Sequence, residues 1–60
     1  MSQLTLAEVI SIREVVGSHV TTAAKLNSYA NSCSDSKIRQ MFTTAAQDAH
    51  KSAQQLISML

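Results

Sequence analysis

Two histidines, one cysteine and four acidic residues are the side chains of this 60-residue sequence best suited to chemistry. His19 and His50 stand far apart in the chain, and Asp48 comes two residues before His50. Because residues i and i+2 of a helix point to opposite sides, Asp48 does not help His50 to bind a metal ion. We expect both histidines to be hydrogen-bonded or half-exposed. The alternatives are a transition-metal site or a pH-sensitive layer at His19 and His50.

The hydroxyl and thiol groups do not form a catalytic set. Cys33 is the only cysteine, which excludes an internal disulfide; we expect a small buried thiol, with an intermolecular disulfide as the alternative. Serines and threonines are abundant, but a hydrolase needs loops and a cleft to arrange a nucleophile with its base. A single glycine, Gly17, excludes a phosphate-binding glycine loop. The sequence therefore predicts a protein that is not an enzyme and that has no catalytic residue and no cofactor.

Length and charge limit the remaining classes of protein. Sixty residues allow one domain, 1–60, whose own core would supply only about 3–5 kcal/mol. The net charge is +1 with no run of either sign, and no apolar stretch approaches the ~18 residues of a membrane span. We therefore expect no nucleic-acid partner, no membrane partner, no signal peptide and a cytoplasmic location. The missing stability must come from a metal ion or from a partner chain.

The first helix has a well-marked start. Thr5 and Glu8 have the spacing of a capping box, in which each side chain bonds to the other residue's backbone. Apolar and small residues then recur at steps of three and four, and the pattern passes through Gly17 without a change of phase. This indicates one helix over about 5–32. We expect Gly17 to let a neighbouring helix approach closely, with a local kink as the alternative.

A short turn separates this helix from a second one. Residues 33–36 form the only turn-like run, in which Asp35 or Ser34 can cap the following helix. The second helix is expected over about 36–60. Two long helices joined by so short a turn predict an all-α fold, an antiparallel two-helix hairpin.

The first helix carries two adjacent rows of apolar and small residues, and the second helix carries one broad stripe. The first row consists of Val9, Ile12, Val16, His19, Ala23, Leu26, Ala30 and Cys33. The second row consists of Leu6, Ile10, Arg13, Gly17, Val20 and Ala24. One of the two rows is expected to face the second helix, and the other has nothing in this chain to meet it. The stripe of the second helix, about 120° wide, consists of Ile38, Phe42, Ala45, Ala46, Ala49, Ala53, Leu56, Ile57 and Leu60.

The unmatched row predicts a homodimer that forms a four-helix bundle. We expect the alanines of the second helix to face Gly17, Ala23 and Ala24 at close spacing, and Met41 and Met59 to fill the core. The residues expected at the core or the dimer interface are Val9, Ile12, Val16, Gly17, His19, Val20, Ala23, Leu26, Phe42, Ala46, Ala49, Ala53 and Leu56.

The residues around the turn also carry a family resemblance. The segment LNSYANSCSDSKIRQMF (residues 26–42) has Tyr29-Ala30-Asn31 before the turn, Asp35 in it, and Ile38, Met41 and Phe42 after it. Leu56 and Met59-Leu60 follow near the end. This arrangement, over about residues 19–60, resembles the spore coat F-like family of short ferritin-like proteins from spore-forming bacteria. The resemblance implies a ferritin-like hairpin, often dimeric, with spore coat proteins as partners and deposition on the spore coat.

The same resemblance leaves no metal role, because the positions that hold metal in such bundles are His19, Ala49 and Ser52 here. Two alternatives to a structural dimer stay open. One is a degenerate ferritin-like metal-binding protein, although its only glutamates, Glu8 and Glu14, both lie near the start of the first helix. The other is an RNA-binding hairpin dimer like the plasmid protein Rop, for which the candidate cations are Lys25, Lys37, Arg39 and Lys51.

Overall fold

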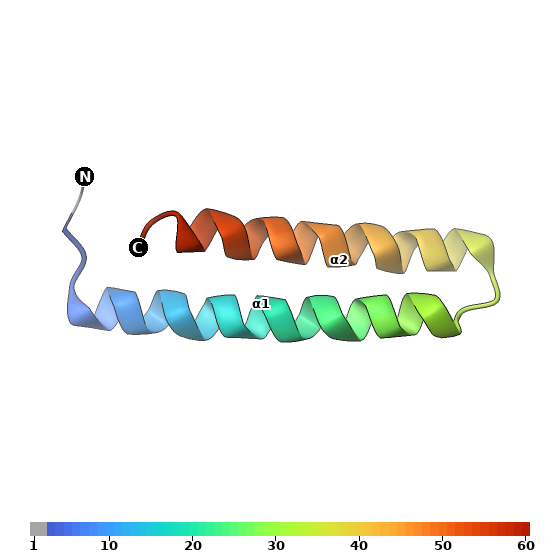
Figure 1. The fold of residues 1–60 in the computed structure, drawn as a ribbon, viewed down its shortest axis with the longest axis horizontal. Helices are drawn as coiled ribbons and strands as arrows, with labels where there is room; N and C mark the ends of the chain where they lie inside the picture. The colour runs from blue at the N-terminus through green and yellow to red at the C-terminus, as the bar shows by residue number, and fades with distance from the viewer. Residues whose placement is uncertain (1–2) are drawn as a thin grey trace.

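A computed structural model describes residues 3–60 as two helices that lie side by side and run in opposite directions (Figure 1). Helix α1 spans Leu6–Ser32 and helix α2 spans Ser36–Ile57. The predicted helical hairpin is therefore confirmed, and α1 runs through Gly17 without a break. Helix α2 ends three residues before the expected position 60, in a short turn.

The capping box holds the start of α1 as expected. The Glu8 backbone N–H donates to the Thr5 hydroxyl oxygen at 3.1 Å, and the Thr5 backbone N–H donates to the Glu8 carboxylate at 2.9 Å. Two backbone donors that the helix itself leaves unpaired are satisfied in this way.

Asp35 begins α2. Its Oδ1 accepts from the backbone N–H groups of Lys37 at 2.9 Å and Ile38 at 3.0 Å. The carboxylate also places negative charge at the positive end of the helix dipole. Of the two capping residues that the sequence offered, the structure thus uses Asp35 and not Ser34.

Arg39, one turn into α2, completes the end of α1. Its Nε donates to the Cys33 carbonyl oxygen at 3.3 Å, and its Nη2 donates to the Ser34 carbonyl oxygen at 3.5 Å. The last turn of α1 contains no basic residue of its own. A side chain from the next helix therefore binds the carbonyl groups that follow α1, where a positive charge is favoured.

The core is a thin line of small side chains between the two helices. Every residue of the first row of α1, from Val9 to Cys33, is at least half-buried, so this is the row that faces α2. On α2 the predicted residues Phe42, Ala46, Ala49, Ala53 and Leu56 are also at least half-buried. Within residues 3–60, the most buried side chains are Ile12, Ala23, Ala30, Ala46 and Ala53. Four of these five are alanines, so the hairpin alone buries little apolar volume.

Several residues expected in the core or at the dimer interface are exposed in the single chain. Within the hairpin, Gly17 and Ala24 do not face the alanines of α2, and a Cβ atom built on Gly17 would meet nothing within 4 Å. Two helices touch along a narrow line, whereas the predicted stripe of α2 is wider than that line. Its edges therefore remain in water, together with the two methionines expected to fill the core: Ile38, Met41, Ile57, Met59 and Leu60.

Candidate interaction surface

The side chains suited to chemistry do not come together in the hairpin. His19 is half-buried in the row that faces α2, while His50 and Asp48 are exposed. Cys33 is a half-buried free thiol beside the turn. Over residues 3–60, no three His, Cys, Asp or Glu side chains lie close enough to hold one metal ion. The arrangement of a single chain thus assembles neither a metal site nor a catalytic set from these residues.

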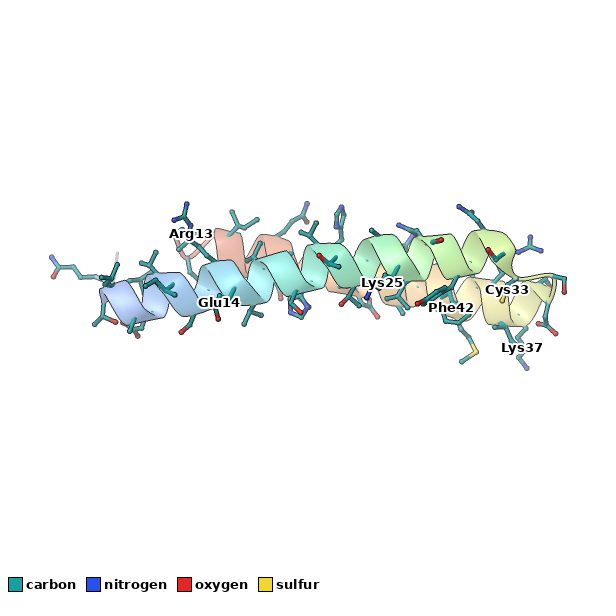
Figure 2. All side chains as sticks on the ribbon, turned by 90° about the horizontal axis from the view of Figure 1, so that it is seen from below. Arg13, Glu14, Lys25, Cys33, Lys37 and Phe42 are labelled. Carbon is teal, nitrogen blue, oxygen red and sulfur yellow. The ribbon has the colours of Figure 1, made fainter. Side chains whose placement is uncertain are left out.

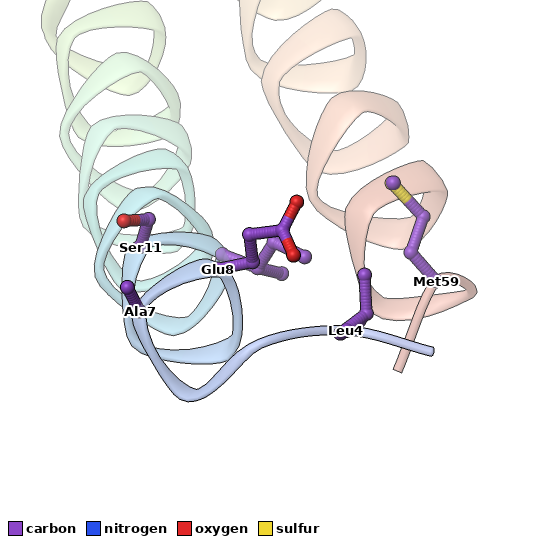
Figure 3. Close-up of a pocket in the computed structure, with 6 residues that line it drawn as sticks. Leu4, Ala7, Glu8, Ser11 and Met59 are labelled. Atoms are coloured by element: carbon purple, nitrogen blue, oxygen red, sulfur yellow. The ribbon is translucent and has the colours of Figure 1, made fainter. Parts of the chain in front are cut away.

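A hollow of about 320 Å³ lies at the open end of the hairpin (Figure 3). Its lining residues are Leu4, Ala7, Glu8, Ser11, Ile12 and Met59. Glu8 is the only one that ionises, and its pKa is lowered because the Thr5 backbone N–H and hydroxyl bond to the ionised carboxylate. The carboxylate therefore serves the capping box, and the rest of the hollow is mostly apolar.

The main unpartnered feature is the second row of α1, called here the outer row: Leu6, Ile10, Arg13, Gly17, Val20 and Ala24. All six residues are exposed in the single chain. Leu6 is 76% exposed, Ile10 49% and Val20 47%, although each carries an aliphatic side chain. One of the two rows of α1 was expected to have nothing in this chain to meet it, and the structure shows that it is this one. Exposed aliphatic side chains gathered on one side of a helix are typical of an interaction site.

The exposed area of the whole chain supports the same conclusion. The hairpin measures 47 × 17 × 9 Å and exposes 4720 Å². A folded monomer of 6.5 kDa is expected to expose only about 3,800 Å². The excess of about 900 Å² is close to the roughly 800 Å² that each partner buries in a standard protein interface. The excess follows from the thin, elongated shape of a two-helix hairpin, in which one side of each helix stays uncovered.

One charged pair accompanies the outer row. Arg13 lies within it, and Glu14 lies at its edge, so the two side chains leave α1 on different sides (Figure 2). Both are exposed. The strip thus combines apolar residues with one positive charge near its middle and one negative charge at its edge, and both can take part in contact with another copy.

A different exposed apolar group lies near the turn. Tyr29, Ile38 and Met41 are all exposed, and the Tyr29 ring lies 5.7 Å from the Phe42 ring, centroid to centroid, at 59°. This tilted contact is a favourable geometry for two aromatic rings. Half of the Tyr29 side chain nevertheless remains in water, at 52% exposure.

The four candidate cations for RNA binding are not equally free. Lys25, Lys37 and Lys51 are exposed, whereas the Arg39 guanidinium is engaged by the two carbonyl groups after α1. This capping role was not predicted from the sequence. The sequence feature that could have indicated this role is that the end of α1 has neither a glycine nor a basic residue of its own. Neither helix of the described chain has the length and apolar character needed to cross a membrane.

Comparisons of the chain with protein-family models, with curated proteins and with solved structures find no match.

Proposed function

We propose that this chain is a non-enzymatic interaction module that works as a homodimer, in which two hairpins form a four-helix bundle. The exposed outer row of α1 carries the proposal, since its aliphatic residues have no partner within the chain. The largely alanine core adds to it, because so little buried apolar volume leaves a 60-residue hairpin dependent on association.

A second copy is the simplest occupant for this surface. Its own outer row has the same apolar strip and the same pair of opposite charges, so two copies related by a two-fold axis are self-complementary. Charged residues make up only 15% of the chain, so long-range repulsion between copies is weak. The sequence resemblance to the coat F-like family adds the spore coat as the proposed setting. Coat proteins would then be further partners of the polar faces that the bundle presents.

The mass in solution tests the dimer. Light scattering should give twice the 6.5 kDa of one chain. The mass should be unchanged by a chelator. It should also be the same at about pH 5 and about pH 7.5, two values between which histidine side chains generally change charge. A dimer lost on chelation would support the metal-binding alternative instead. A monomer under all conditions would refute the proposal.

Two valines provide a matched pair of variants. Val20 belongs to the outer row and Val15 does not, yet they are similarly exposed at 47% and 44%. Val20→Lys should give a monomer, because dimerisation would bury an unpaired ammonium group. Val15→Lys should leave the dimer intact. The opposite result would place the interface on the other side of α1 and would contradict the role of the outer row.

A further inference from the structure

Gly17 and Arg13 are both unexplained within the single chain. Gly17 weakens α1 by about 1 kcal/mol relative to alanine. Its helical backbone does not need a glycine, and no neighbour in the hairpin comes within 4 Å of the position of a Cβ atom. Arg13 interrupts an otherwise apolar or small row. Gly17 leaves space above the helix surface, and Arg13, one turn away, has a long side chain. In a dimer, the Arg13 side chain of one copy can fill the space above Gly17 of the other copy.

We propose that the two α1 helices of the dimer pair antiparallel through their outer rows, with the two-fold axis beside residue 15. This inference rests on the proposed homodimer and specifies its register. Arg13 then lies across the partner's Gly17, and Ile10 lies opposite the partner's Val20. Leu6 covers the partner's Ala24, so the long side chains of one copy meet the small residues of the other.

Electrostatics favours this arrangement. The position opposite Arg13 is three residues from the partner's Glu14, or about 4.5 Å along the axis. The arginine side chain can extend that far along the axis, so this register brings each Arg13 toward the Glu14 carboxylate at the edge of the partner's row. A parallel pairing in register would instead place Arg13 beside the partner's Arg13, so two positive charges would repel each other. It would also set Gly17 against the partner's Gly17, where no side chain fills the space.

The neighbouring antiparallel register is poorer in apolar contacts. A shift of one heptad would move the axis between residues 18 and 19. Ile10 would then lie opposite the partner's Asn27, and Leu6 opposite the partner's Asn31. Apolar side chains would be buried against amides that have no partner there. Compared with that register, the one with the axis beside residue 15 brings Ile10 of one copy against Val20 of the other.

Disulfide crosslinking tests the register, in chains that carry Cys33→Ser. One chain carries Ile10→Cys and the other Val20→Cys, and the two are mixed, unfolded, refolded and oxidised. A crosslinked dimer should form in the mixture, and each chain alone should stay uncrosslinked. In this register Ile10 lies ten residues, about 15 Å, from the partner's Ile10, and the same holds for Val20. A disulfide joins Cα atoms no more than about 7 Å apart.

The controls separate this inference from the proposed function. Leu6→Cys mixed with Ala24→Cys tests the same register with a second pair, and circular dichroism checks that every chain keeps its helices. Crosslinking of the Val20→Cys chain with itself would place the axis elsewhere and overturn the proposal. A dimer by light scattering without a crosslink in either mixture would overturn the register alone. A monomer before any substitution would refute the homodimer itself.

Discussion

Replacing Ala46 with leucine tests whether the two helices are held as close as the alanine core implies. Ala46 is 3% exposed, and Ala23 on α1, also 3% exposed, lies at a similar distance from the turn. If the helices had space between them, burying a leucine there would gain about 1.5–3 kcal/mol. In a close-packed contact the added carbons force the helices apart, at a cost of about 1–3 kcal/mol. We expect the second outcome, a loss of stability.

Urea unfolding followed by circular dichroism measures this effect, at one fixed chain concentration. A small protein has a urea slope of about 1 kcal/mol per molar, so the midpoint should fall by about 1–3 M. Gln47→Leu is the matched control, since Gln47 is exposed and adjacent in the chain. That variant should change stability by less than about 0.5 kcal/mol. A midpoint that rises for Ala46→Leu would refute the close contact between the helices.

Three further variants test the two N-terminal helix caps and the row of α1 that faces α2. Asp35→Ala removes an N-cap that accepts two backbone hydrogen bonds, so the unfolding free energy should fall by about 1 kcal/mol, and an unchanged urea midpoint would argue against the cap. Glu8 has a pKa lowered from 4.5 by its bonds from Thr5, so its contribution is present at neutral pH and is lost as the pH falls through the lowered value. Glu8→Gln keeps a capping side chain without the charge, and its melting temperature should fall less than that of the wild type between neutral pH and about pH 3; equal falls would contradict this. His19→Leu should keep or raise the melting temperature, because the half-buried imidazole lies in an apolar row; a large loss would show that it makes a specific bond or binds a metal ion.

The residues of the row of α1 that faces α2 could be predicted as a group, although the sequence did not show which of the two rows meets α2, and the reason is physical. Steps of three and four residues keep side chains on one side of a helix, and a hairpin with one short turn gives that side a single neighbour. The N-terminal cap of α1 could also be predicted, because a capping box depends only on Thr5 and on Glu8 three residues later. The cap depends only on residues close together in the chain, and the contact side of α1 depends only on the hairpin topology.

The edges of α2 were not predictable in the same way. Ile38, Ile57 and Met41 are as apolar as the residues that are buried, but their burial depends on how wide the contact between the helices is. Small residues on both helices bring the axes close together and narrow the contact, which leaves side chains at its margins in water. Arg39 presents a similar case, since its bonds to the end of α1 depend on the path of the turn in space.

The exposure of the outer row and the small size of the core between the helices have the same cause. Alanines at the contact allow close helices but contribute little apolar area, so the hairpin gives up the burial that larger side chains would provide. Three further aliphatic side chains of α1, Leu6, Ile10 and Val20, lie on the side that α2 does not cover. The chain therefore places much of its apolar surface where only another molecule can bury it. In the proposed homodimer the free energy of folding and that of association would therefore be coupled, and stability would rise with the concentration of chains.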